Sequence, residues 1–243
     1  MTADYVSDRK RSRPVTKRKK TDFFKKNKLA TAGLIIIVVV IIAGAYIVLM
    51  PATEDGGTTI TEDEEKTIAV IDTSLGTIKV ELYVDDVPNT CENFIKLAND
   101  SFYNGLVFHR VANLDPEQPN THVIQGGGFW ANGTQKESPY GSIDLEINDD
   151  YSHVDGAIAM ARTSNPNSAT SQFYICDGAH EFLDDDYRQA NLGDRGYTVF
   201  GKVYEGMSVV RSIASVSTTT KFVYMENWPV DDVIINSITI ENQ

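Results

Sequence analysis

The chain has 243 residues, a formal net charge of −12 and two cysteines. This length allows one or two domains, and so acidic a protein would repel the phosphates of a nucleic acid, so we expect no nucleic-acid partner. Cys91 and Cys176 fit no zinc-binding spacing and are too few for a disulfide framework. The four histidines are scattered without ligand spacing, so we expect neither a metal nor another cofactor.

The first 28 residues are basic: they hold eleven of the 22 Lys and Arg residues but only three of the 34 Asp and Glu residues. They show no hydrophobic periodicity, which predicts a disordered tail. Residues 29–50 differ, because none of these 22 residues carries a charge. As a helix rising about 1.5 Å per residue they would cross a hydrocarbon core of about 30 Å, so we expect a single transmembrane helix.

The charges on either side of residues 29–50 predict an orientation in the membrane. Lysines precede this segment and acidic residues follow it, so the basic tail is expected in the cytoplasm and the rest outside it. A cleaved signal peptide is an alternative, because residues 43–45 offer small side chains for cleavage, although the apolar run exceeds the usual length of about 7–15 residues. Residues 51–66 are acidic and nearly free of large apolar side chains, which predicts a solvated linker.

From Thr67 onward the pattern becomes that of a β-rich domain. Ile68–Ile71 and Thr77–Tyr83 read as a hairpin around a turn at residues 74–76. Pro88 opens a helix, with Asn89 and Glu92 spaced like a capping pair, and a second helix is expected after Gly206. Further strands are expected at Ile143–Ile147, Ala157–Ala161, Phe173–Cys176, Val199–Val203 and Val233–Ile240. The two cysteines fall in apolar segments and read as small core residues, with a Cys91–Cys176 disulfide left open.

Two stretches carry polar residues inside apolar surroundings, Val107–Phe129 and Ala159–Cys176. In the first, Arg110 lies between Phe108 and Val111, and an arginine is costly to bury there without a partner. This placement predicts a cationic hydrogen-bond donor at the lip of an apolar pocket. The alternative is a structural arginine paired with a carboxylate such as Glu146.

These stretches resemble the cyclophilins, the peptidyl-prolyl cis/trans isomerases, in several motifs that occur in the same order: FHR, QGGGF, MAR, SATSQFYIC, FLDDD and YTVFGKVYEGM. The resemblance runs from about residue 67 to the C-terminus. It implies that residues 67–243 form a mainly β domain, an eight-stranded antiparallel barrel capped by two α-helices.

The resemblance also implies a set of site residues. Arg110 matches the catalytic arginine of the family, and Gln125 matches the glutamine that helps to orient it. The matching substrate-binding positions are His122, Val123, Ala161, Arg162, Gln172, Tyr174, Phe182, Leu183 and Tyr197. His122 takes the place of the phenylalanine that usually floors the pocket, and the loop at residues 112–121 is longer than the usual connection. These two departures predict one of two outcomes. Either the pocket is more polar and isomerisation is slower, or the loop supplies another wall of the pocket.

Rotation about an amide bond has a barrier of about 18–20 kcal/mol. A catalyst of X–Pro rotation needs an apolar slot for the proline ring and a donor that favours the twisted amide, but no nucleophile or cofactor. We therefore expect a monomeric, membrane-anchored isomerase that acts on Pro-containing polypeptides among exported or cell-surface proteins. Two alternatives remain, a non-catalytic Pro-peptide-binding or chaperone module and a tethered structural domain.

Overall fold

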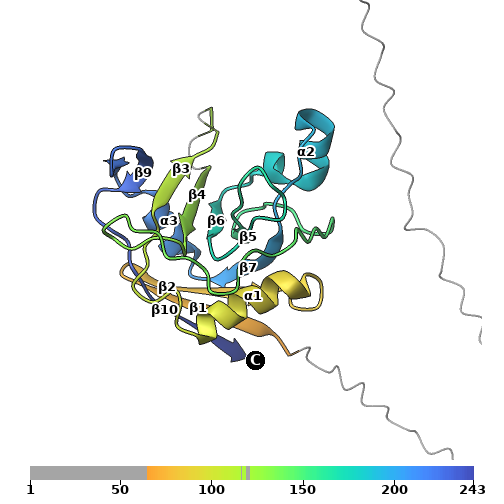
Figure 1. The fold of residues 1–243 in the computed structure, drawn as a ribbon, viewed down its shortest axis with the longest axis horizontal. Coiled ribbons are helices and arrows are strands. Elements are labelled where there is room, and N and C mark those ends of the chain that lie inside the picture. The colour runs from red at the N-terminus through yellow and green to blue at the C-terminus, as the bar shows by residue number, and fades with distance from the viewer. Residues whose placement is uncertain (1–64, 116, 119–120) are drawn as a thin grey trace, which may run out of the picture. The chain divides into compact units, whose positions relative to one another are not determined.

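The computed structural model describes residues 65–115, 117–118 and 121–243. Their main feature is a curled antiparallel sheet of eight strands in the order β10-β1-β2-β7-β5-β6-β4-β3, with β8 and β9 forming a separate two-stranded sheet (Figure 1). The strands are β1 (Thr67–Thr73), β2 (Gly76–Leu82), β3 (Arg110–Asn113), β4 (His122–Gly126), β5 (Ala157–Met160), β6 (Phe173–Asp177), β7 (Val199–Glu205), β8 (Thr218–Lys221), β9 (Met225–Pro229) and β10 (Ile235–Asn242).

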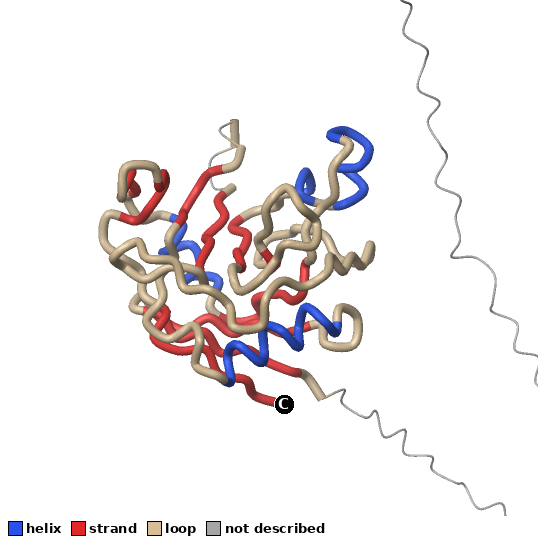
Figure 2. The backbone as a smooth tube through the Cα atoms, in the orientation of Figure 1, coloured by secondary structure: helices blue, strands red, loops and turns tan. Residues whose placement is uncertain are grey.

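Three α-helices accompany the sheet in the described part of the chain. They are α1 (Pro88–Asn99), α2 (Asp185–Leu192) and α3 (Met207–Ala214), with a short 3-10 helix, η1 (Glu181–Leu183), before α2. Helix α1 packs against β10, whereas α3 packs against β2, β4 and β6. The connection from β4 to β5 is mostly loop, drawn in tan in Figure 2.

Backbone hydrogen bonds link the residues before β3 to those at the start of β10, so the sheet curls back on itself. Gly105 donates to the carbonyl of Ile235 (2.8 Å), and Ile235 donates to the carbonyl of Leu106 (2.8 Å). Phe108 donates to the carbonyl of Val233 (2.9 Å). The predicted mainly β, eight-stranded antiparallel architecture is confirmed.

Aromatic rings fill the core and fix the strand that carries the site. Phe94 of α1 contacts Tyr103, Phe173 and Phe200 with ring centroids 5.1–5.5 Å apart, and all four side chains are fully buried. Burying a side chain of this size contributes about 1.5–3 kcal/mol. Because side chains alternate along a strand, anchoring Phe173 in the core directs Tyr174 to the opposite face of β6.

Several predicted elements are confirmed. β1 and β2 form the expected hairpin, and α1 begins at Pro88. Helix α3 follows Gly206, whose φ of 95° favours glycine. A Cβ at this glycine would lie 2.5 Å from the Thr77 carbonyl oxygen, so no other residue fits without movement. Cys91 and Cys176 are buried and unpaired, so the disulfide alternative is wrong, and burial raises the pKa of the Cys91 thiol to about 12.

Three expectations about the fold are wrong, and one element was not expected. Residues 143–147 form no strand; only Ile143 makes an isolated bridge, to Ala169. The described residues contain three α-helices instead of two, and the β8–β9 hairpin was not expected. Asn89 and Glu92 do not cap α1. Instead Glu146, from a distant loop, accepts hydrogen bonds from the backbone N–H and the hydroxyl of Thr90, both at 2.9 Å, which satisfies donors at the helix N-terminus.

The predicted basic tail (1–28) and transmembrane helix (29–50), and most of the predicted linker (51–66), lie outside the described residues. In the part of the chain that the structure describes, no helix has the length and apolar character needed to span a membrane.

Candidate active site

Three neighbouring strands bring the two predicted catalytic residues together. Arg110 begins β3 and pairs with Gln125 of β4, which in turn pairs with Tyr174 of β6. Residues that are directly opposite in adjacent antiparallel strands share a face of the sheet. The three side chains therefore lie on one face, while the neighbouring residues Ile124 and Phe173 belong to the core on the other face.

A short chain of hydrogen bonds orients the arginine. Arg110 Nη1 donates to Gln125 Oε1 (3.3 Å), and Gln125 Nε2 donates to Gln172 Oε1 (3.0 Å). Arg110 is half-buried, and burial lowers the pKa of its guanidinium, although an arginine remains charged in proteins. Arg110 forms no ion pair with any described residue.

The alternative that Arg110 is a structural arginine paired with Glu146 is wrong. Glu146 is engaged by α1, where Asn89 Nδ2 also donates to it at 2.9 Å. Arg110 thus donates to a neutral amide oxygen and to no carboxylate, and most of its five N–H donors have no partner among the described residues.

Beside Arg110 lies a cavity of about 150 Å³, which we call the site cavity. Its volume equals that of about five liquid waters, enough for a five-membered ring. Its lining is Arg110, Leu114, Val123, Gln125, Ala161, Arg162, Tyr174, Leu183 and Tyr197. Eight of these nine residues were predicted from the sequence; Leu114 was not.

Three predicted residues do not line the site cavity: His122, Gln172 and Phe182. His122 precedes Val123 on β4, so its side chain points to the other face of the strand, and the expectation that it floors the pocket is wrong. Gln172 does not reach the cavity itself but accepts a hydrogen bond from Gln125, which lines it. The half-buried Phe182 packs beside His180, with ring centroids 5.7 Å apart. Strand alternation around Gln125 would have predicted the orientation of His122.

Comparisons with known proteins place this geometry in a family. Residues 68–240 match the family model for "Cyclophilin type peptidyl-prolyl cis-trans isomerase/CLD". The chain belongs to the cyclophilin family. It is 41% identical over 176 residues to a peptidyl-prolyl cis-trans isomerase of Acinetobacter baylyi, covering 72% of this chain and 86% of that protein. It is 36% identical over 168 residues to peptidyl-prolyl cis-trans isomerase B of Escherichia coli, covering 69% and 96%.

A solved cyclophilin shares the fold. The cyclophilin-type isomerase of Cryptosporidium parvum, crystallised in the presence of the dipeptide Ala-Pro, matches with a TM-score of 0.59 and 27% identity, over 72% of this chain and 99% of that one. The enzyme class of this chain is therefore peptidyl-prolyl cis-trans isomerase. Within residues 65–243 as described, no group of three or more His, Cys, Asp or Glu side chains is placed to hold a metal ion.

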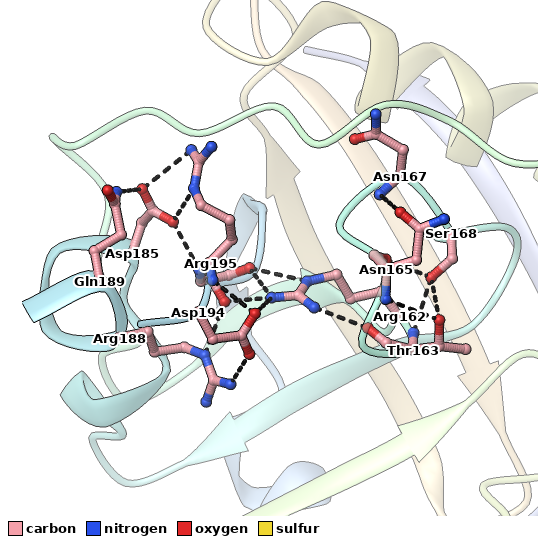
Figure 3. Close-up of polar contacts among 11 residues, drawn as sticks. Arg162, Thr163, Asn165, Asn167, Ser168, Asp185, Arg188, Gln189, Asp194 and Arg195 are labelled. Atoms are coloured by element: carbon pink, nitrogen blue, oxygen red, sulfur yellow. Dashed lines mark hydrogen bonds and ion pairs between the residues drawn. The ribbon is translucent and has the colours of Figure 1, made fainter. Parts of the chain in front are cut away.

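Arg162 holds a loop at the edge of the cyclophilin site. Its guanidinium donates to the carbonyls of Thr163 (2.8 Å), Gly196 (3.1 Å from Nε) and Arg195 (Figure 3). It also lies 4.5 Å from the ring centroid of Tyr197, and only 2% of its side chain is exposed. The side chain expected to contact substrate thus supports Tyr197, which lines the site cavity.

Leu114 reaches the site cavity because the β3–β4 loop is tied at its base. Thr121 Oγ1 donates to Gln118 O (2.8 Å) and lies 3.1 Å from Asn113 Oδ1, and Leu114 N donates to Thr121 O (3.2 Å). The predicted alternative that the loop supplies another wall is what the structure has. The wall is apolar, which suits a proline ring.

Behind the cavity wall, Tyr174 belongs to a hydrogen-bonded set that sequence reasoning missed. The Tyr174 hydroxyl lies 2.8 Å from His153 Nε2, and His153 Nδ1 lies 2.5 Å from Asp184 Oδ1. His153 and Tyr174 are 1% and 5% exposed, so a buried hydroxyl is satisfied by a buried ring, as its burial requires. These contacts fix the orientation of the Tyr174 ring, which forms part of the cavity wall.

Proposed function

We propose that this cyclophilin isomerises X–Pro bonds by seating the proline ring in the site cavity and stabilising the twisted amide with the Arg110 guanidinium. The observation that carries the mechanism is that Arg110 lies half-buried at a cavity whose lining includes the aliphatic side chains of Leu114, Val123, Ala161 and Leu183, with no ion pair among the described residues. The Cryptosporidium relative, solved in the presence of Ala-Pro, supports a proline-containing ligand.

The proposed step is a difference in binding between ground and transition state. Twisting the amide removes its resonance and leaves a basic prolyl nitrogen, for which a cationic donor is the suitable partner. A donor that is already oriented in a partly dry site stabilises such a change more strongly than water does. The Gln125–Gln172 hydrogen bond keeps Arg110 in that orientation.

The competing function, a non-catalytic Pro-peptide-binding or chaperone module, rested on His122 and the long loop. His122 does not line the site cavity, and the loop contributes Leu114. Neither departure therefore places a polar side chain in the site cavity, and the two observations on which the competing function rested no longer favour it.

Measuring turnover of an Ala-Pro-containing peptide tests this mechanism. With the full-length protein in detergent, we expect Arg110→Met to lower kcat/KM by about 100-fold or more, the usual effect of losing one transition-state donor. The matched control is Arg211→Met, because Arg211 is an exposed arginine of α3 paired with Asp155. Full turnover by Arg110→Met would reject the mechanism, and peptide binding without turnover by the wild type would favour the binding module.

We also propose that the clients are exported or cell-surface proteins, reached by a domain on the outside of a single membrane span at residues 29–50. Support comes from the 22 uncharged residues of that segment, the basic residues before it and the acidic residues after it. A cleaved signal peptide would place the domain on the same side of the membrane but release it.

Cysteine labelling tests this topology in intact cells. A membrane-impermeant maleimide should label a Thr58→Cys variant and leave a Ser7→Cys variant unlabelled. The native Cys91 and Cys176 give a low background because both are buried. Labelling only of the Ser7→Cys variant would reverse the orientation. Loss of residue 7 from the mature protein, seen by mass spectrometry, would show cleavage instead of an anchor.

A further inference from the structure

A second cavity shares Arg110 with the site cavity. It has a volume of about 330 Å³ and forms where β9 lies beside β3 (Figure 1). We call it the hairpin cavity, and its lining is His109, Arg110, Phe129, Tyr224, Met225, Glu226 and Asn227. Nothing in the mechanism proposed above uses its residues other than Arg110.

The β8–β9 hairpin beside this cavity keeps an unfavourable turn. Phe222 and Val223 have φ values of 52° and 74°, a region that a bulky or β-branched residue rarely adopts. Such strain of about 1–3 kcal/mol for each residue persists only when surrounding structure imposes it, and it is common at ligand-binding positions.

The base of the hairpin supplies that support. Trp228 is fully buried, and its Nε1 donates to Asp232 Oδ1 at 2.8 Å, the same atom that Lys221 Nζ approaches at 2.8 Å. The Phe222 ring packs 5.1 Å from that of Trp228. The strained turn is therefore held in place, while Val223 and Tyr224 at the tip are 96% and 75% exposed.

The hairpin cavity suits a large apolar side chain. Phe129, Tyr224 and Met225 offer ring and thioether surfaces, and burial lowers the pKa of His109 to about 4, so that ring is neutral at pH 7. Arg110 and Glu226 carry opposite charges, so the lining has no net charge that would select a charged ligand. Exposed aromatic surface next to a polar rim is typical of peptide-binding positions.

We propose that the hairpin cavity binds a large apolar side chain of the client polypeptide, within about three residues of the proline that is isomerised. The inference rests on the proposed function, because the occupant of one cavity fixes the occupant of the other. Arg110 borders both, and an extended peptide advances about 3.3–3.6 Å per residue. A chain whose proline lies in the site cavity therefore reaches the hairpin cavity with a nearby residue.

A peptide series tests the proposal directly. Each peptide is rich in alanine with one proline, and one phenylalanine is placed at each of the positions from three before to three after it. Exchange NMR with the full-length protein gives kcat/KM without a coupling protease, so the sequence can vary freely. For the wild type we expect one position to raise kcat/KM about fivefold over the all-alanine peptide, the effect of partly burying a phenyl ring.

The readout is the kcat/KM for the preferred phenylalanine peptide divided by the kcat/KM for the all-alanine peptide. This ratio does not depend on the fraction of folded enzyme. In Tyr224→Ala and Met225→Ala this ratio should fall toward one. In the matched control Val223→Ala it should stay near fivefold, because Val223 is at the same tip but outside the lining. Normal turnover without any preference for phenylalanine, or a preference that survives both substitutions, would overturn the hairpin cavity alone. Absence of turnover of the all-alanine peptide by the wild type would overturn the proposed function, and this inference with it.

Discussion

Two arginines flank the site cavity and are used in opposite ways. Arg110 is half-buried and makes one hydrogen bond, to a neutral amide oxygen. Arg162 donates to three backbone carbonyls and lies over the Tyr197 ring. Both residues line the same cavity, but only one retains donors for a ligand. A guanidinium whose N–H donors all have acceptors stabilises the fold, whereas one that keeps free donors at a cavity is available to bind substrate.

The largest expected effect in this comparison is on stability. Arg162→Met keeps the aliphatic stem but leaves the carbonyls of Thr163 and Gly196 without a charged donor, whereas the Arg195 carbonyl keeps its hydrogen bond from Arg188 Nε. We therefore expect the free energy of unfolding to fall by about 2–3 kcal/mol. Arg110→Met should change it by less than about 0.5 kcal/mol, because burial already disfavours that charge. Urea unfolding of both full-length variants measures the difference. Equal losses would mean that the two arginines do the same structural work.

The next test concerns the orientation of Arg110, which keeps N–H donors free for a ligand. A Cβ at Gly128 would lie 2.5 Å from Gln172 Cγ, so Gly128→Ala should displace Gln172 and break its hydrogen bond to Gln125. We expect kcat/KM to fall about fivefold, the value of one such bond. Gln172→Ala is the matched variant, and the double substitution should cost no more than either one. Additive losses would show that Gly128 acts by another route.

The Arg110–Gln125 pair could be predicted because a motif names both residues and strand pairing places them opposite each other. The β8–β9 hairpin could not, since its turn contains Phe222 and Val223 at positive φ, where sequence rules expect glycine or asparagine. Helix α2 was missed for another reason. Only Asp185 of its eight residues is buried, so it has no apolar stripe to detect.

The stretch at residues 143–147 shows the limit of periodicity. Ile143, Leu145 and Ile147 alternate with polar residues as in a strand, but their backbone has no neighbouring strand. Leu145 N instead donates to Asn167 Oδ1 at 3.0 Å, and Glu146 N donates to Thr198 Oγ1 at 3.3 Å. Side-chain acceptors replace the ladder, and this exchange depends on residues far away in the sequence.

The smallest effect concerns Asp184, which lies behind the Tyr174 wall of the site cavity and accepts hydrogen bonds from Ser152 and His153. Burial would raise the pKa of Asp184, but hydrogen bonds from His153 and Ser152 outweigh burial and hold that pKa below its ordinary value. A carboxylate with a lowered folded-state pKa stabilises the fold above its unfolded pKa of about 3.9, and this contribution is lost as the pH falls through the folded value.

We therefore expect the stability advantage of the wild type over Asp184→Asn to be complete near neutral pH and to shrink below about pH 4. Urea unfolding at a series of pH values measures it. Asp186→Asn is the matched control, because Asp186 is exposed in the first turn of α2 and its replacement should change the free energy of unfolding by less than about 0.5 kcal/mol at neutral pH. If the advantage over Asp184→Asn instead grew on acidification, Asp184 would be protonated in the fold, and its hydrogen bonds would no longer explain how the Tyr174 wall is held.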